Sequence, residues 1–189
     1  MNRCFLVLQM YDPKIEEELV KKWEEEKLYK FEASSNKPLY VIDTPPPFTS
    51  GVLHMGHALS YSFIDFVARY KRMKGYNVLY PQGWDTMGFP TERAVEKKYG
   101  KGLKPEEFVA KCEELSINNL TAMKQQMKRL GFSMDDSLEY ITMSKDYKRK
   151  VQLSVLLMYE KGFVYKGKHA VYWCPYCHTA IAREETEDR

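Results

Sequence analysis

Two histidines, His54 and His57, stand at the start of a segment with helical periodicity, directly after a proline-rich loop. The N-terminus of a helix presents unpaired backbone N–H groups and the positive end of the helix dipole, and both favour phosphate. Imidazole can donate a hydrogen bond to a phosphate oxygen, and Gly56 lets a flat base or a ribose approach the backbone. This arrangement suits a nucleoside triphosphate. The competing interpretation is two histidines beside an ordinary turn.

A second group of residues that could carry chemistry is the pair Cys174 and Cys177, which has the spacing of half a tetrahedral zinc site. A complete site needs four ligands, and His178 is adjacent to Cys177, which makes ligation by both awkward. A redox role is disfavoured because the pair follows a predicted hairpin strand and does not open a helix. The two cysteines are therefore candidate zinc ligands.

The elements that must hold the histidines have the order strand, loop, helix, strand. Residues 39–42 form an apolar run that predicts a buried strand, and three prolines at 45–47 forbid further strand or helix. Residues 55–74 have helical periodicity and end before Gly75, at the C′ position. Residues 78–80 predict the next strand. This is a parallel α/β unit with its crossover, and such sheets bind ligands beyond the carboxyl ends of their strands.

Two further helices have clear boundaries in the sequence. Asp12 as N-cap and Pro13 at the first helical position begin one over about residues 13–28. Pro105 begins a second helix of about 25 residues, whose apolar stripe ends at Gly131. Met10 immediately precedes the first of these helices, so the residues before it are expected to be a dispensable extension.

The C-terminal part predicts a helix and a hairpin. Residues 147–161 have apolar positions at helical spacing, with Asp146 as the expected N-cap. Residues 163–165 and 170–173 flank a Lys-Gly-Lys turn and predict the two strands of the hairpin.

Composition excludes several classes of protein. A chain of 189 residues that is 44% hydrophobic can bury a core, while a net charge of +3 is too mild to indicate nucleic-acid binding. The longest apolar stretch, near residues 153–159, is far shorter than the roughly 20 residues of a membrane span. The first ten residues lack a full signal peptide, and the four cysteines form no disulfide framework. We therefore expect a cytoplasmic protein without a membrane segment.

Several motifs together carry a resemblance to one family. Residues 45–57, PPPFTSGVLHMGH, resemble the HIGH signature of the class I aminoacyl-tRNA synthetases. Residues 69–78 and the PQGWD of residues 81–85 are similar to the valine, isoleucine and leucine subgroup. Within it, DTPPP at 43–47, PQGWD and GFPTE at 88–92 are most similar to archaeal-type valyl enzymes. The resemblance covers roughly residues 10–188.

The resemblance implies an α/β fold, the first half of a Rossmann-like class I synthetase catalytic domain with parallel strands, flanking helices and a C-terminal hairpin carrying CxxC. The expected organisation is an N-terminal extension and helix over 1–38, a nucleotide-binding half-domain over 39–162, and the hairpin with the start of an editing-domain insertion over 163–189. The implied reaction is activation of valine by ATP with Mg, followed by transfer to tRNA(Val).

The resemblance also assigns site residues. His54 and His57 match the signature histidines and would contact the ATP phosphates as the catalytic pair. The residues implied in ATP binding are Thr49, Gly51, His54, Gly56 and His57, and those implied in amino-acid binding are Pro46, Pro47, Trp84 and Asp85. Asp85 would pair with the substrate ammonium, whereas the prolines and Trp84 would line an apolar pocket. Ordinary packing for Trp84 and the prolines, and a helix or turn cap for Asp85, are the alternatives.

The chain departs from the family pattern in one place, and one further segment resembles a family motif only superficially. Many relatives have Cys-His after Trp-Asp where this chain has Thr86 and Met87, which alters the fine shape of the amino-acid pocket. The TMSKD of residues 142–146 superficially resembles the KMSKS loop, but it lies between two predicted helices and well before the CxxC. We therefore reject that match, and the chain lacks the lysines that normally stabilise the activation transition state.

Three hypotheses follow from these observations. The first is part of a valine--tRNA ligase that needs its missing half, supplied by a second chain. The second is a non-catalytic paralogue that binds ATP, tRNA or a protein. The third, another HxGH nucleotidyltransferase, is disfavoured because those enzymes lack the PPP, GWD and CxxC companions. A half-sheet also predicts a large exposed apolar patch and a tendency to associate.

Overall fold

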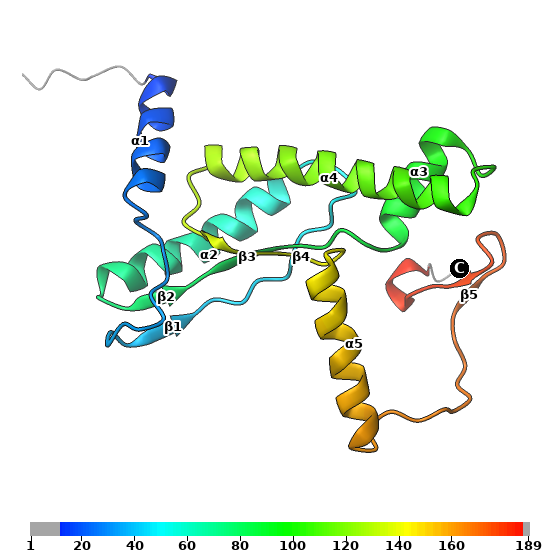
Figure 1. Cartoon of the computed structure of the whole chain (residues 1–189). Helices are drawn as coiled ribbons and strands as arrows, with labels where there is room; N and C mark the ends of the chain where they lie inside the picture. Colours follow the sequence, from blue (N-terminus) through cyan, green and yellow to red (C-terminus); the bar gives the residue numbers. More distant parts are fainter. Residues whose placement is uncertain (1–11, 187–189) are drawn as a thin grey trace, which may run out of the picture. The chain divides into compact units, whose positions relative to one another are not determined.

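The computed structural model describes residues 12–186 (Figure 1). The chain divides into two compact units, Met1–Lys148 and Arg149–Arg189, which are described separately. The expected dispensable extension before Met10 lies outside the described residues. No helix within residues 12–186 combines the length and the apolar character that a membrane crossing requires.

The first unit is built on parallel strands. β1 (Leu39–Val41) pairs with β2 (Asn77–Leu79), and β3 (Pro81–Trp84) pairs with β4 (Asp135–Ile141), both in parallel. Only Tyr80 separates β2 from β3, so together they form one extended run that borders β1 with its first half and β4 with its second. The two predicted strands and their parallel pairing are confirmed. β3 and β4 were not predicted, because proline, glycine and polar residues break their apolar pattern.

Two crossover connections cover one face of these strands (Figure 1). α2 (Met55–Met73) joins β1 to β2, while α3 (Phe89–Tyr99) and α4 (Pro105–Arg129) join β3 to β4. Both long helices contribute to one core cluster: Tyr61, Trp84, Leu120, Met123 and Met127. The predicted ends of α2 and α4 are confirmed, because Gly75 and Gly131 have positive φ values of 86° and 71° just beyond them.

The opposite face of the strands is open. Side chains alternate along a strand, and Tyr40 and Ile42 pack in a cluster with Val78 and the α2 side chain of Ala68. Leu39 and Val41 therefore point the other way, where they are 57% and 54% exposed. The prediction of a buried strand is wrong for β1: within the described part of the first unit, helices cover only one of its faces.

The helix at the N-terminus begins as predicted and ends earlier. α1 spans Pro13–Glu25, and the Asp12 side chain accepts a hydrogen bond of 3.0 Å from the backbone N–H of Lys14. Lys27, with φ of 49°, turns the chain away before residue 28.

α5 (Lys145–Glu160) begins one residue before Asp146, so the predicted Asp146 N-cap is wrong. The Ser144 hydroxyl takes that place and accepts a hydrogen bond of 3.3 Å from the backbone N–H of Tyr147. Asp146 instead lies in the first helical turn, where a carboxylate interacts favourably with the positive end of the helix dipole.

The C-terminal unit contains a hairpin, but not where the Lys-Gly-Lys turn predicts it. The strands are β5 (Trp173–Cys174) and β6 (Thr179–Ala180), which pair antiparallel, followed by a 3-10 turn, η1 (Arg183–Glu185). Residues 163–172 form no strand, so the predicted strands at 163–165 and 170–172 are wrong. A hairpin carrying the CxxC is confirmed, because the turn between β5 and β6 holds both cysteines.

A buried polar network fixes α2 to the segment before β4. The Asp65 carboxylate, on the inner face of α2, accepts hydrogen bonds from the Ser133 backbone N–H at 2.7 Å, the Ser133 hydroxyl at 2.5 Å and Arg69 Nε at 2.7 Å. Arg72 donates to the same serine, to its hydroxyl at 2.6 Å and its carbonyl at 2.8 Å. Arg69 also donates to the Tyr29 hydroxyl at 3.0 Å, which ties in the N-terminal segment.

Loss of the Asp65 carboxylate should be costly. In Asp65→Ala the Ser133 N–H, the Ser133 hydroxyl and the partly buried Arg69 lose their acceptor, and we expect a loss of about 3 kcal/mol in the free energy of unfolding. Asp136→Ala is the control, because this half-exposed partner of Lys128 should contribute less than about 1 kcal/mol. Urea denaturation followed by circular dichroism measures both, and equal midpoints for the two variants would contradict the prediction.

Candidate active site

The two signature histidines cap α2 reciprocally. His54 is the N-cap, and its Nδ1 accepts a hydrogen bond of 3.1 Å from the backbone N–H of Gly56. The backbone N–H of His54 in turn donates to Nδ1 of His57 at 3.3 Å, and the two ring centroids lie 4.0 Å apart. A Cβ at Gly56 would lie 2.9 Å from the His54 ring, so a side chain at this position would displace that ring.

The capping hydrogen bonds also determine which ring nitrogen of each histidine carries the proton. An imidazole whose Nδ1 accepts a hydrogen bond carries its proton on Nε2 when it is neutral. Burial, helped by the neighbouring His54, lowers the pKa of His57 below its ordinary value, which favours the neutral form. Both rings therefore offer Nε2–H donors away from the helix, at the end of α2 where the dipole attracts anions.

The proline loop is joined to the end of β3 by a parallel bridge. The backbone N–H of Asp85 donates to the Pro47 carbonyl at 3.0 Å, and that of Thr49 donates to the Asp85 carbonyl at 3.0 Å. Thr49 is fully buried and Pro47 is buried, while Pro46 is half-buried and Gly51 is exposed in the turn that leads to the histidines. The structure thus brings together the loop expected to bind ATP and the carboxylate expected to bind the amino acid.

Helix side chains that the motifs do not include hold this loop in place. Asn119 of α4 donates to the Thr49 carbonyl at 2.8 Å, and Gln126 of α4 accepts from the Leu53 backbone N–H at 3.1 Å. Tyr61 of α2 donates from its hydroxyl to the Pro45 carbonyl at 3.1 Å. Sequence reasoning missed these anchors because a polar residue on a long amphipathic helix has no local signal for a distant backbone partner. The three contacts fix the loop at its start, middle and end.

A pair of threonines holds the backbone and carboxylate around Asp85. The Thr142 hydroxyl, just beyond β4, accepts from the Thr86 backbone N–H at 2.9 Å and lies 3.4 Å from Asp85 Oδ1, to which it donates. The hydroxyls of Thr86 and Thr142 lie 3.1 Å apart, and the Thr86 hydroxyl accepts from the Met143 N–H at 3.0 Å. Thr86, the departure from the family pattern, is therefore integrated in the site. The TMSKD segment lies beside Asp85 and supplies this clamp.

Strand alternation places polar groups together on the open face. Asp43 and Asp85 each follow a residue that packs beneath the helices, so both point to the open side. Tyr140 of β4 lies over Gly83, where any Cβ would collide with its ring. Burial, and then the charges of Tyr147, Asp43 and Asp85, raise the pKa of Tyr140 above its ordinary value. Two carboxylates and a neutral phenol at this edge suit a cationic group such as an ammonium.

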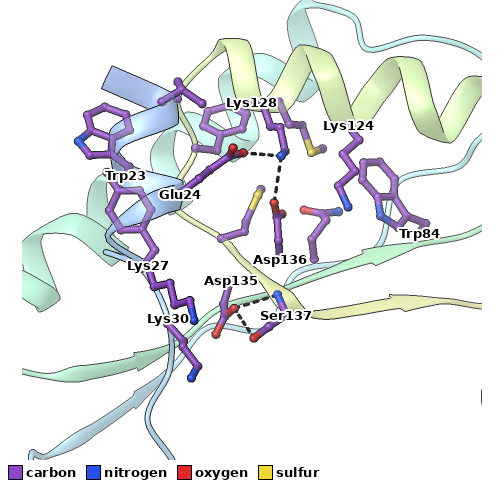
Figure 2. Close-up of a pocket in the computed structure, with 17 residues that line it drawn as sticks. Trp23, Glu24, Lys27, Lys30, Trp84, Lys124, Lys128, Asp135, Asp136 and Ser137 are labelled. Carbon is purple, nitrogen blue, oxygen red and sulfur yellow. Dashed lines mark hydrogen bonds and ion pairs between the residues drawn. The ribbon is translucent and has the colours of Figure 1, made fainter. Parts of the chain in front are cut away.

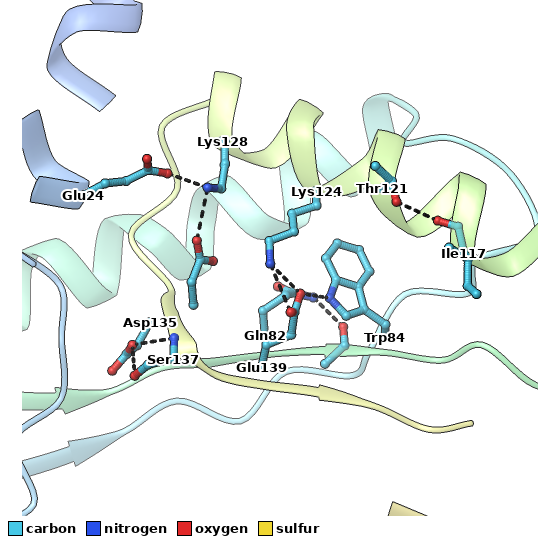
Figure 3. A network of polar contacts seen from close by, with 12 residues as sticks. Glu24, Gln82, Trp84, Ile117, Thr121, Lys124, Lys128, Asp135, Ser137 and Glu139 are labelled. Atoms are coloured by element: carbon cyan, nitrogen blue, oxygen red, sulfur yellow. Dashed lines mark hydrogen bonds and ion pairs between the residues drawn. The ribbon is translucent and has the colours of Figure 1, made fainter. Parts of the chain in front are cut away.

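Trp84 points in the opposite direction from Asp85. Its side chain is 1% exposed within the core beneath α4, and its indole N–H donates to Glu139 Oε1 at 2.7 Å. Lys124 reaches the same carboxylate at 3.0 Å, as Figure 3 shows. The structure therefore does not bring Trp84 and Asp85 together on one face. A role for Trp84 in the amino-acid pocket stays a prediction.

A cavity of about 400 Å³ lies on the helix-covered side, between α1, α4 and the paired strands β3 and β4 (Figure 2). Lys128 bridges its walls, with Nζ 2.5 Å from Glu24 of α1 and 3.4 Å from Asp136. Among its lining residues are Lys27 and Lys30, and none of the predicted site residues except Trp84. This cavity is distinct from the edge that carries the histidines, and its ion pairs connect α1 to α4.

The CxxC turn has local features that suit metal ligation. The backbone N–H of Cys177 donates to Cys174 Sγ at 3.4 Å, and His178 has a positive φ of 53°. An N–H···S hydrogen bond stabilises a thiolate, which is the form that binds metal. Nevertheless, residues 12–186 contain no cluster of three or more His, Cys, Asp or Glu side chains that could hold a metal ion. Two thiols are fewer than the four ligands of a structural zinc site, so zinc binding at Cys174 and Cys177 stays a prediction.

Comparisons with known proteins agree on one family. Residues 18–189 match the family described as tRNA synthetases class I (I, L, M and V). The chain is 51% identical to valine--tRNA ligase of Methanocaldococcus jannaschii over 94% of its length, and 53% identical to that of Pyrococcus furiosus over 93%. It spans only 20% of the length of each of these relatives.

A solved structure extends the likeness to three dimensions. The chain resembles LeuRS of Agrobacterium radiobacter K84, solved as a ternary complex with tRNA and LeuAMS, with a TM-score of 0.79 and 33% sequence identity. The match covers 93% of this chain and 21% of that one. The half-sheet with its crossover helices is therefore the fold of the first part of a class I catalytic domain.

The histidine cap should make the folded chain less stable as the pH falls. The pKa of His57 is lowered in the folded chain, so the unfolded chain binds more protons as the pH falls below the ordinary value of 6.5. The contribution of neutral His57 to the free energy of unfolding is therefore complete above pH 6.5. It is lost as the pH falls through the lowered pKa. NMR titration should show His57 titrating below the value of a free histidine.

A variant separates the cap from the titration. His57→Gln keeps a side-chain acceptor at the third helical position, the usual place of glutamine in a capping box, but does not titrate. We expect it to lose part of the acid sensitivity between about pH 7.5 and 5.5 while it remains folded. An unchanged slope of stability against pH in His57→Gln would show that His57 does not contribute it.

Proposed function

The chain belongs to the class I tRNA synthetases, and we propose that it carries the ATP-binding and amino-acid-binding part of a valine--tRNA ligase. The observation that carries this proposal is the reciprocal histidine cap, joined through the proline loop to Asp85. A triphosphate and an amino acid would meet where these elements converge. The relatives at about half identity that support valine as the amino acid are about five times as long as this chain.

The proposed reaction begins with attack of the valine carboxylate on the α-phosphate of ATP, with pyrophosphate as the leaving group. The Nε2–H groups of His54 and His57 donate hydrogen bonds to phosphate oxygens. These bonds stabilise the negative charge that develops on the leaving pyrophosphate. Thr49, Gly51 and Gly56 shape the backbone around the nucleotide. The Mg that accompanies ATP would neutralise phosphate charge, and the reaction requires no covalent nucleophile from the protein. Catalysis then rests on positioning and electrostatic stabilisation.

The amino acid is oriented by its ammonium group. Asp85 accepts the ammonium, and its carboxylate is held by Thr142 and accompanied by Asp43 and Tyr140 on the open face. Pro46 and Pro47 provide apolar surface beside it, and Trp84 supports the strand from beneath. The carboxylate of the substrate is thereby directed toward the end of α2.

The proposal extends to partners and to zinc. The activated valine would be transferred to tRNA(Val) in the cytoplasm, with the remaining catalytic half supplied by further chain or by a second chain. Cys174 and Cys177 would provide two of four zinc ligands, and the other two would come from outside the described residues. Such a site would order the hairpin of β5 and β6.

Amino-acid-dependent exchange of labelled pyrophosphate into ATP tests the proposed function. The chain is mixed with the part of the P. furiosus ligase that lacks the matched segment, and valine, isoleucine, leucine and threonine are compared. We expect exchange with valine that falls about 100-fold in His57→Ala, while His169→Ala, at an exposed position outside the strands and helices, serves as the control. ATP binding without exchange by any amino acid would instead favour a non-catalytic paralogue.

The threonine clamp yields a separate prediction for amino-acid binding. Thr142→Val removes the hydroxyl that donates to Asp85 and accepts from Thr86, so the carboxylate loses its fixed orientation. In the same mixture, the KM for valine should rise about 10-fold, equivalent to one hydrogen bond to a charged group, with the KM for ATP unchanged. Thr142→Ser should restore it, and Thr121→Val, which alters a hydroxyl bonded only within α4, should have no effect. Equal changes in both KM values would indicate general distortion.

A further inference from the structure

We propose that the outer face of α2 is a docking surface for the remaining part of the synthetase. This inference rests on the proposed function, because it assumes that the chain works as part of a longer enzyme. The outer face is formed by seven apolar side chains, each at least 42% exposed: Met55, Leu59, Phe63, Phe66, Val67, Tyr70 and Met73.

α2 is amphipathic, but its apolar stripe faces outward and its polar network faces the core. A surface helix normally turns its apolar stripe to the core and its charges to water. The side chains of α2 that are buried are Tyr61, Asp65 and Ala68, and the inner face includes the only carboxylate of the helix. The apolar residues recur at intervals of three and four, so they form one stripe along the opposite side.

The stripe is too extensive for an incidental surface. At about 1.5 Å per residue, Met55 and Met73 lie roughly 27 Å apart along the helix axis. Contiguous apolar area of this kind on a soluble protein marks an interaction surface. The stripe includes two phenylalanines near its centre, and buried aromatic side chains of this type commonly anchor interfaces.

The length of the relatives favours the rest of the ligase as the occupant. They have about five times the length of this chain while sharing half of its residues across the matched segment, so a large part of the ligase lies outside the segment. α2 also carries the histidine pair at its first turn, so a segment that docks along the stripe ends beside the phosphate-binding end. Docking would thereby bring the groups that this chain lacks to the site.

Charge argues against a second copy as the occupant. The C-terminal end of α2 has Lys71 and the exposed Lys74, whereas Arg72 turns inward to Ser133. The first turn of α2 has no acidic residue, and its single carboxylate, Asp65, is buried. A second copy would therefore bring an apolar stripe with basic neighbours and no exposed carboxylate on the helix. The geometry points to a partner surface that is apolar, with carboxylates positioned near the C-terminal end of α2.

Binding of the complementary part of the ligase tests the inference. The chain is mixed with the P. furiosus ligase that lacks the matched segment, and sedimentation velocity measures the complex. The double variant Phe63→Glu with Phe66→Glu should weaken a one-to-one complex at least 100-fold. Val109→Glu is the matched control, because it places the same charge at an exposed apolar position of α4. Circular dichroism verifies that each variant is folded.

Hydrogen exchange of the unaltered chain gives a second measurement that needs no variant. Residues 55–73 should gain protection on mixing with the complementary part. Binding that leaves α2 unprotected, or a chain that already protects this face as a monomer, would overturn the inference. A homodimer that the double variant abolishes would assign the face to a second copy and overturn it as well.

The same mixture separates this inference from the proposed function. Pyrophosphate exchange with valine in the absence of α2 protection would leave the function standing and remove the docking surface. Protection of α2 without exchange by any amino acid would leave the docking surface standing and remove the function.

Discussion

The buried carboxylate of Asp65 is the contact on which the arrangement of the first unit depends. It accepts three hydrogen bonds, two from Ser133 and one from Arg69, and so joins α2 to the segment that leads into β4. α2 carries the histidines at its N-terminus, and β4 ends at Thr142 beside Asp85. One ionic network therefore sets the relative position of the histidine pair and the edge that carries Asp85. An unpaired charge at this depth would be strongly unfavourable, which makes the geometry specific.

Along the strands, the side chains that pack in the core and those at the candidate site lie on opposite faces. Along the run from Val78 to Asp85, alternate side chains pack beneath the helices, and the intervening ones face the open side. Trp84 and Asp85 are adjacent in the sequence yet serve opposite faces, one in the core and one at the site. Gly83 is part of the same pattern, because Tyr140 occupies the space that its side chain would need. The open face is thus shaped by small and polar residues, and the covered face by large apolar ones.

The reversed amphipathicity of α2 follows from the same division. Its inner face is occupied by the network around Asp65 and by the hydroxyl of Tyr61, which anchors the proline loop. The apolar side chains then face outward, away from the strands, while Leu39 and Val41 are exposed on the opposite, open face of the sheet. The exposed apolar patch expected for a half-sheet is confirmed on both surfaces. A chain with two uncovered apolar surfaces has the surface of a component rather than that of a complete domain.

The sequence by itself determined the local elements and the class of the site. Asp12, Pro105 and Gly131 end or begin helices through their own backbone preferences, and the order of strand, proline loop and helix placed His54 and His57 at a helix N-terminus. These are properties of neighbouring residues, so periodicity and capping rules reach them. The family resemblance followed from the same short motifs.

Tertiary structure decided what depends on residues far apart in the chain. Asn119, Gln126 and Thr142 hold the site through partners more than fifty residues away, and no local pattern marks them. The hairpin was expected at a Lys-Gly-Lys turn and formed around the CxxC, because short exposed strands have little local preference of their own. Which face of α2 is buried was also a tertiary decision: helical periodicity identifies a stripe, but only the packing partners determine whether the stripe or its opposite faces the core.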